Sequence, residues 1–517
     1  MMRPARWALL LTLASCRPVA PPAPVPAPSP APAPDSSRVR PTAPCAIVPT
    51  RDLFREGLTR LADSLVGDPM FRSAHWGVLV VDPLAGDTLY SRNAGKLFLP
   101  ASNQKLLTGA TALAQLGPDY TWETRLLAAG RPVRGVLRGD LALIGSGDPS
   151  VSDSLGGGSA MQPLLALADS LAARGVRTIT GRLIRGADAF PDSSLGFGWA
   201  WDDLDYDYSA PVDELFFNEG YATVTVIGGA RVGAPVRVRT APATTVPRLG
   251  AVRVTTAVGP SRVTWAGDVR GRRPTLTLAG TVAPRDSVVL TVAIRHAAAA
   301  YLDAFAEALA APGIRVRGGV EPDALADTTG MTTVVARRSP PLRAVLPRFE
   351  KPSQNQLGEL LFKTLAHEGT GVGTADSGRA VVERQLLAWG ADSAGFAVRD
   401  GSGLSRHDYV TPETIVKVLD AMRRHPEFAL FRDALPIAGV DGTIRNRMRG
   451  TPAAGNARAK TGTLDKARNL SGYVTTADGR LLLVSLMANN HVVANREVER
   501  VQDALIAWLA GTPLEGR

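Results

Sequence analysis

The sequence is poor in cysteine, histidine and lysine, and these shortages exclude several classes of site. Its two cysteines, Cys16 and Cys45, both precede the segment that we expect to fold, which excludes a disulfide framework and a cysteine-rich zinc site. The six histidines form no His-x-x-x-His pair, and the single Gly-Lys dipeptide lacks the following Ser or Thr of a phosphate-binding loop. We therefore expect no metal and no cofactor.

The sequence also lacks a hydrophobic run long enough to span a bilayer, which needs about 20 residues. A short apolar stretch, residues 7–14, follows two arginines and leads into Leu-Ala-Ser-Cys, which ends at Cys16. This pattern is typical of a bacterial lipoprotein signal, which is cut before a cysteine that carries the lipid. An ordinary signal peptide cleaved elsewhere is the alternative. Both predict export, and the first also predicts removal of residues 1–15 and a membrane anchor at Cys16.

Residues 16–50 are dominated by proline and alanine, a composition that favours an extended chain and cannot bury a core. We interpret this segment as a tether between the anchor and the folded part. Arg17 stands where the usual inner-membrane retention signal has Asp. The lipoprotein hypothesis therefore predicts the periplasmic face of a bacterial membrane, the outer one if the cell has two.

Positive charge exceeds negative charge, with a net charge of +10. Such a balance could suit nucleic acid, anionic lipid or an acidic wall polymer. The arginines are scattered rather than gathered into a basic arm, so we expect no nucleic acid partner. Only seven of the 58 basic residues are lysines, so each lysine can be considered singly.

The apolar periodicity predicts an α/β (α+β) domain that is interrupted by a large, mostly β insertion. In residues 51–130 it predicts a helix, two strands and a second helix that starts near residue 100. Residues 131–325 show short β-rich runs separated by Gly, Pro and Thr turns. Helical patterns return at residues 300–313 and recur in residues 326–517, where three strands and a closing helix follow them. The first and last of these segments would form one domain.

Three short motifs stand in a fixed order along the chain. They are Ser102-x-x-Lys105, Ser353-Gln354-Asn355 and Lys460-Thr461-Gly462. Taken singly, each has an ordinary explanation as a helix cap, a polar turn or a solvated strand cation. Together and in this order they are the signature of penicillin-binding proteins and class A β-lactamases.

The chemistry of the residues agrees with this signature. A serine hydroxyl is a poor nucleophile until a base takes its proton, and Lys105 lies one helical turn from Ser102. A lysine can act as this base only when it is neutral. Burial and a second cation nearby, Lys460, would both lower the pKa of Lys105.

The chain resembles the penicillin-binding protein 4 type of D-alanyl-D-alanine carboxypeptidase and endopeptidase, peptidase family S13. The similarity covers residues 51–510 and includes the long insertion. It implies that the interrupted α/β domain has a serine β-lactamase/transpeptidase-like fold. Gln354 departs from the Asp that is usual in the family, but this position performs no chemistry. Beyond the three motifs the similarity rests on GSGDPS, GWAWDDLDYDYSAPV, DGSGLSR and VDGTIRNR.

The resemblance implies a serine DD-peptidase that acts on peptidoglycan stem peptides through an acyl-enzyme on Ser102. It trims D-Ala-D-Ala as a carboxypeptidase, cleaves cross-links as an endopeptidase, or does both, and β-lactams inhibit it. Lys105 would be the base, and Ser353 would pass the proton toward the leaving nitrogen. Asn355 would bond Lys105 and the substrate amide.

The resemblance also assigns the third motif to substrate binding. Lys460, Thr461 and Thr463 would hold the terminal carboxylate of the substrate. The backbone N–H groups of Ser102 and Thr463 would form the oxyanion hole. Gly462 lacks a side chain, so that the substrate can lie against the strand edge there.

A more specific hypothesis concerns Arg406, which closes the DGSGLSR segment. In the family this segment lies close to the active site, and a guanidinium can grip a carboxylate through two parallel hydrogen bonds. Arg406 could therefore bind the side-chain carboxylate of diaminopimelate in the stem peptide. A plain surface arginine is the alternative.

Other functions stay open from the sequence alone. A serine β-lactamase shares the motifs, but the large insertion is foreign to those compact enzymes. A tethered wall-binding protein with a vestigial site would fit the spacer and the basic charge, but the complete set of motif residues speaks against it. A Ser-His-Asp triad through His407 lacks the Gly-x-Ser-x-Gly elbow. Trp199 and Trp201 could stack on a ligand, although packing of the insertion is favoured.

Overall fold

The computed structural model describes residues 50–243, 247–267 and 275–515. Cys16, Cys45, the signal segment 1–15 and residues 16–49 of the tether lie outside these residues. The chain divides into two units, Met1–Val48 and Pro49–Arg517, and all that follows concerns the second. None of the helices in the described ranges is both long and apolar enough to cross a membrane.

An antiparallel sheet joins the two ends of the folded chain. Its strand order is β19-β20-β21-β1-β2, so the first strand of the sequence lies beside the last. Val78 pairs with Leu486, and Lys460 pairs with Ser471. The strands are β1 (His75–Asp82), β2 (Asp87–Arg92), β19 (Arg458–Leu464), β20 (Ala467–Thr475) and β21 (Leu481–Asn489).

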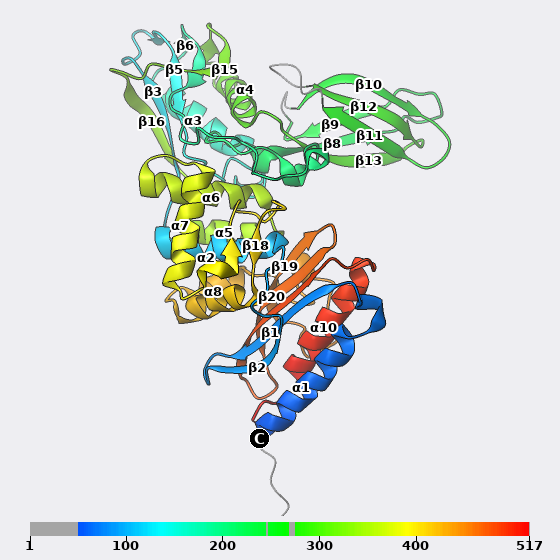
Figure 1. Ribbon diagram of the computed structural model, residues 1–517. Helices are drawn as coiled ribbons and strands as arrows, with labels where there is room; N and C mark the ends of the chain where they lie inside the picture. Colours follow the sequence, from blue (N-terminus) through cyan, green and yellow to red (C-terminus); the bar gives the residue numbers. More distant parts are fainter. Residues whose placement is uncertain (1–49, 244–246, 268–274, 516–517) are drawn as a thin grey trace, which may run out of the picture. The chain divides into compact units, whose positions relative to one another are not determined.

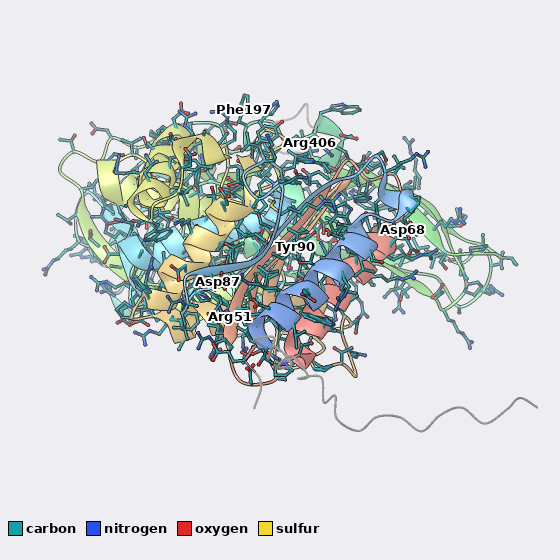
Figure 2. All side chains as sticks on the ribbon, turned by 60° about the horizontal axis from the view of Figure 1, so that its bottom comes forward. Arg51, Asp68, Asp87, Tyr90, Phe197 and Arg406 are labelled. Carbon is teal, nitrogen blue, oxygen red and sulfur yellow. The ribbon has the colours of Figure 1, made fainter. Side chains whose placement is uncertain are left out.

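The helices α1 (Thr50–Val66) and α10 (Asn495–Gly511) pack against each other and against this sheet (Figure 1). Both present an apolar stripe at helical spacing, which buries residues such as Phe54 and Leu505 in a common core with the strands. Arg51 donates to Asp87 on β2 at 3.0 Å, and Figure 2 labels both residues. The N-terminal helix is thereby fixed to the edge of the sheet.

A group of helices forms a second core that also includes residues of β1 and β21. Its members are α2 (Gln104–Leu116), α5 (Leu342–Glu350), α6 (Asn355–Thr370), α7 (Ala375–Ala388), α8 (Pro412–Arg424) and α9 (Phe428–Ala434). In α2 every residue from Gln104 to Leu113 is buried, because its sequence is apolar or small on all sides apart from a few polar residues. The one charged residue of α2, Lys105, is therefore carried into the interior.

The segment between the two halves of this domain contains its own mixed sheet, in the order β15-β7-β5-β3-β16. β3 and β16 flank the predicted insertion, residues 131–325, and pair with each other. The strands are β3 (Glu123–Ala128), β5 (Leu141–Ile144), β7 (Leu183–Arg185), β15 (Val320–Leu325) and β16 (Thr332–Arg338). Two helices lie within this segment: α4 (Ala297–Ala310) covers most of the helix predicted at residues 300–313, and α3 (Met161–Ala173) was not predicted.

Three small sheets complete the insertion, in the orders β14-β6-β4, β13-β8-β9 and β10-β12-β11. Along β8 buried and half-buried residues alternate, as the period of a strand with one buried face requires. The strands are β4 (Val136–Leu137), β6 (Thr178–Ile179), β8 (Tyr221–Ile227), β9 (Arg237–Ala241), β10 (Arg248–Thr256), β11 (Arg262–Gly267), β12 (Thr275–Val282), β13 (Ser287–Ala293) and β14 (Arg315–Val316).

Short elements connect these parts. β17 (Phe396–Ala397) and β18 (Tyr409–Val410) form a two-stranded ladder next to the helical group. Turns of 3-10 helix are η1 (Pro69–Phe71), η2 (Ala101–Asn103), η3 (Trp201–Asp203), η4 (Asp207–Ser209), η5 (Asn218–Gly220), η6 (Ser393–Gly395) and η7 (Gly442–Ile444). Of these, η2 matters most for the site, because it carries Ser102 and leads directly into α2.

Candidate active site

Ser102 lies in a turn that is fixed by hydrogen bonds to two strands of the neighbouring sheet. The residue before it, Ala101, has a φ of 47°, a left-handed conformation that is strained for a residue with a Cβ. Asn103 donates from Nδ2 to the carbonyl of Lys460 on β19 at 2.8 Å and accepts from the Ser471 hydroxyl on β20 at 3.0 Å. These buried hydrogen bonds place the Ser102 hydroxyl beside the third motif.

Lys105 is fully buried, and its amine meets three oxygen atoms. Nζ lies 2.9 Å from the Ser102 Oγ, 2.6 Å from the Asn355 Oδ1 and 2.7 Å from the Ser402 carbonyl. Burial, followed by the positive charge of Lys460, lowers the pKa of Lys105 to about 7. A neutral amine has two N–H groups and one lone pair. Two of the three neighbours are carbonyl oxygens that can only accept, so the lone pair is left for the hydroxyl of Ser102.

The second motif stands at the start of α6. Ser353 has a φ of 66°, again a left-handed conformation, and its hydroxyl accepts from Lys460 Nζ at 2.7 Å. Asn355 accepts from Lys105 and donates from Nδ2 to the Tyr208 carbonyl at 2.8 Å, which fixes the orientation of its amide. Gln354, the departure from the family pattern, caps the helix by accepting from the Leu357 N–H at 2.8 Å. Its side chain therefore has a structural task.

The third motif lies on β19, at the edge of the sheet. Lys460 is fully buried and links the motifs through Ser353, while the Thr461 hydroxyl donates to that of Thr443 at 2.7 Å. The Thr463 hydroxyl accepts from the Arg468 guanidinium. Each of these three side chains of β19 is thus fixed by a hydrogen bond to a neighbouring residue.

Gly462 has a structural reason to lack a side chain that the sequence alone does not show. A Cβ at this position would lie 2.4 Å from the Pro100 carbonyl oxygen and 3.2 Å from the Asn103 nitrogen. The glycine therefore lets β19 come close to η2, so that the third motif and Ser102 can meet.

The DGSGLSR segment supplies the carbonyl that contacts Lys105, a contribution that the sequence did not reveal. Asp400 accepts from the backbone N–H groups of Gly403 at 2.6 Å and Ser405 at 2.7 Å. From α6, Glu359 accepts from the Ser402 N–H at 2.9 Å, and burial raises the pKa of Glu359. The two buried carboxyl groups hold the loop so that the Ser402 carbonyl faces the amine. In the sequence, the only sign of this role was that Glu359 interrupts an apolar stretch of α6.

Arg406 follows this loop and is exposed to solvent. Its backbone N–H approaches the Gly198 carbonyl at 3.4 Å, and the adjacent ring of His407 lies 5.2 Å from that of Phe197. Figure 2 shows Arg406 and Phe197 near each other. Within the described part of the chain, the Arg406 guanidinium has no ion pair, so it is available to a ligand. The His407 ring packs on Phe197, and among the described residues it has no hydrogen bond to a serine or an acid that would form a triad.

Trp199 and Trp201, the two tryptophans considered as a stacking platform, have different surroundings. Trp199 donates from Nε1 to Asp400 at 2.9 Å and so helps to hold the loop. Trp201 is 85% exposed in η3, so the interpretation that it packs the insertion is wrong.

One acidic group in the described ranges has the spacing of metal ligands: Asp188, Asp213 and Glu214. An Arg185 nitrogen lies 2.7 to 3.5 Å from a carboxylate oxygen of each. The guanidinium thus supplies the positive charge at this place, and burial raises the pKa of Glu214. These acids lie outside the cluster of Ser102, Lys105, Ser353, Asn355 and Lys460.

Comparison with known proteins gives one consistent family. A model of the "D-Ala-D-Ala carboxypeptidase 3 (S13) family" matches residues 58–512. The D-alanyl-D-alanine carboxypeptidase of Actinomadura sp. (strain R39) is 36% identical over 462 residues, covering 87% of this chain and 83% of that protein. The D-alanyl-D-alanine carboxypeptidase DacB of Haemophilus influenzae is 26% identical over 421 residues, covering 80% and 85%.

A solved structure agrees at the level of the fold. The crystal structure of penicillin-binding protein 4 from Haemophilus influenzae superposes with a TM-score of 0.73 at 24% sequence identity, covering 87% of this chain and 98% of that one. The predicted fold class is thereby confirmed.

Proposed function

Because the chain belongs to the D-Ala-D-Ala carboxypeptidase S13 family, we propose that its reaction is carried by Ser102, Lys105, Ser353, Asn355 and Lys460. The protein is a serine-type D-Ala-D-Ala carboxypeptidase. The observation that carries the assignment of residues is the surroundings of the Lys105 amine, where two carbonyl oxygens occupy both N–H groups and the third neighbour is the Ser102 hydroxyl. A base in this arrangement has one direction from which it can take a proton.

In the first half of the reaction, neutral Lys105 takes the proton of Ser102 while Oγ attacks the carbonyl carbon between the two D-Ala residues. The carbonyl oxygen gains negative charge, and the backbone N–H groups of Ser102 and Thr463 stabilise it. These donors are fixed before the substrate binds, because Gly462 keeps β19 close to η2. Little reorganisation is then needed as the charge develops.

Acylation is complete when the C–N bond breaks and the leaving amine takes the proton that Lys105 accepted from Ser102, passed on through the Ser353 hydroxyl. Lys460 donates to that hydroxyl at 2.7 Å and so keeps it oriented. The charge of Lys460, with the hydroxyls of Thr461 and Thr463, binds the carboxylate of the terminal D-Ala. Water then hydrolyses the ester bond between the acyl group and Ser102, which regenerates the free enzyme.

The substrates are the stem peptides of peptidoglycan, and the enzyme therefore acts outside the cytoplasm. We also expect cleavage of cross-links. In a cross-link, as in D-Ala-D-Ala, the D-Ala carbonyl is bonded to an amine whose carbon has the D configuration and carries a free carboxylate. Digestion of purified muropeptides, followed by mass analysis, tests both. Release of D-Ala from pentapeptide monomers supports the carboxypeptidase, and conversion of cross-linked dimers to monomers supports the endopeptidase. Intact substrates would contradict the assignment.

The sequence supports a lipoprotein anchored through Cys16, at the periplasmic face of the outer membrane if the cell has two membranes. The Pro/Ala tether would then let the folded part reach the wall. Mass analysis of the protein extracted from membranes tests this: a mature N-terminus at Cys16 carrying lipid supports it, and an unmodified start elsewhere contradicts it.

Arg406 is proposed to bind the side-chain carboxylate of diaminopimelate. Arg406→Ala should then lower kcat/KM on diaminopimelate peptides by roughly 10- to 150-fold, the range for a hydrogen bond to a charged group. Diacetyl-Lys-D-Ala-D-Ala lacks this carboxylate, so its hydrolysis should be almost unchanged. Equal losses on the two substrates would mean that Arg406 supports the fold or the chemistry instead.

A further inference from the structure

Glu350, the last residue of α5, is a fully buried acid for which the reaction just described has no use. It stands three residues before Ser353, and its exposed fraction is 0%. Both of its carboxyl oxygens lack a hydrogen-bond partner within the described ranges. An ionised carboxyl group that is buried without hydrogen bonds is costly, so either the group is protonated or its surroundings supply a compensating charge.

The neighbouring helix α2 leaves room for this carboxyl group. A Cβ at Gly109 would lie 2.7 Å from the Glu350 Oε1 and 3.2 Å from the Phe349 ring. Gly109 is four residues after Lys105, which puts both on the same face of α2. The missing side chain thus allows the carboxyl group to lie against the helix that carries the proposed base.

The charges that act on Glu350 are those of Lys460 and Lys105, and both are buried cations. For Lys460, Glu350 is the acid whose charge favours the protonated amine. Lys105 is also attracted by Asp400 and Glu359, which hold the DGSGLSR loop, and is repelled by Lys460. Burial raises the pKa of Glu350, while the two lysines oppose that change.

Other charged groups on the elements around α5 have partners elsewhere. Arg348 pairs with Glu219, and Lys351 pairs with Asp441. On α9, Arg432 pairs with Asp433. On α6, Lys363 pairs with Asp192. This leaves the two lysines of the first and third motifs as the cations whose charge acts on Glu350.

The reaction needs Lys105 neutral and Lys460 charged at the same time. With an ionised Glu350, these three groups carry no net charge, which is the least costly state for a buried cluster. We propose that Glu350 is a positioning residue of the acylation step: its carboxylate is the counter-ion that keeps the proton on Lys460 and sets the pH range in which Lys105 is neutral and Lys460 charged. The inference rests on the proposed roles of the two lysines.

Removal of the negative charge should move both lysines in the same direction. Without it each amine loses its proton more readily, so the pKa of Lys105 and that of Lys460 both fall. Acylation begins when Lys105 becomes neutral and ends when Lys460 becomes neutral. The whole bell-shaped pH profile should therefore move toward acid, by on the order of one to two pH units for interacting buried charges.

The test measures the second-order rate of acylation by a fluorescent penicillin from pH 5 to 10. The proteins are wild type, Glu350→Gln, Glu350→Asp and Glu368→Gln, the last of which removes the same charge from the exposed end of α6. Glu350→Gln should shift both limbs toward acid, so that acylation above pH 8 falls at least tenfold. Glu350→Asp, which keeps the charge, and Glu368→Gln should stay close to wild type.

Steady-state hydrolysis of diacetyl-Lys-D-Ala-D-Ala gives a second readout. Loss of the proton from Lys460 weakens carboxylate binding, so KM of Glu350→Gln should rise more than kcat falls at pH 8. If Glu350→Gln does not fold, Glu350→Leu, which has no polar group to satisfy, replaces it with the same expectation. An unshifted profile in a folded, acylated Glu350 variant would overturn the inference. A wild type that penicillin does not acylate would instead overturn the proposed function.

Discussion

Ser102→Ala should abolish covalent labelling by penicillin and reduce peptide hydrolysis to the background rate. A β-lactam presents a strained amide and a carboxylate where the peptide substrate presents its own, so both reagents need the same nucleophile. Removal of a catalytic serine costs on the order of 10⁶ in kcat, which makes this one of the largest effects that a single substitution can have here. Intact-mass measurement after incubation with penicillin gives the result directly.

The fold should survive this substitution. Ser102 is half-buried, and the hydrogen bonds that fix its turn come from Asn103 rather than from its own hydroxyl. We therefore expect the melting temperature of Ser102→Ala to stay close to that of wild type. A matched control, Ser377→Ala, changes a serine on the first turn of α7, and its labelling should be complete. Full labelling of Ser102→Ala would mean that another residue is the nucleophile.

The sequence was informative about elements whose pattern is local. The apolar spacing of residues 496–511 predicts a closing helix, and α10 covers Asn495–Gly511. The three predicted strands before it are β19, β20 and β21. The family model and the relatives confirm the predicted family and enzyme class. Both could be predicted because motifs far apart in the chain occur in the order that the family requires. Within the insertion, α3 was missed because its surroundings are dominated by turns and strands.

The sequence was less informative where contacts decide the role of a residue. The acceptor that Ser402 offers to Lys105 is a backbone carbonyl, which every residue has. Glu350 and Glu359 become unusual only through burial, which depends on how α5, α6 and α2 pack. Gly462 is explained by the approach of two segments that are distant in sequence. The site residues therefore come from motifs, while the groups that tune them come from tertiary structure.

The pH dependence of the wild type follows from the proposed base. Since the pKa of Lys105 is lowered to about 7, the neutral amine becomes abundant as the pH rises through 7. The pKa of Lys460 is lowered by burial too, although Glu350 counteracts this. Acylation should consequently rise through neutral pH and decline once Lys460 loses its proton.

Lys105→Arg should lower the acylation rate by on the order of 10²- to 10⁴-fold, the contribution of a positioned general base. Arginine can still donate to the Asn355 side chain and the Ser402 carbonyl, so the loop and α6 keep a buried donor. It stays protonated at every working pH and therefore has no lone pair for the Ser102 proton. The remaining rate should show no acid limb near pH 7, because the group that titrates there is gone.

Lys460→Arg is the matched control, since it makes the same exchange at the other buried lysine. The proposed role of Lys460 requires only a positive charge and a hydrogen bond to Ser353, and arginine can supply both. Its loss of acylation should be smaller than that of Lys105→Arg, and its acid limb should persist. Stopped-flow acylation with a chromogenic β-lactam, together with thermal melts of both variants, measures this difference. Near-normal acylation by a folded Lys105→Arg enzyme would place the base at another residue, and the three carbonyl and hydroxyl contacts of Lys105 would then be structural.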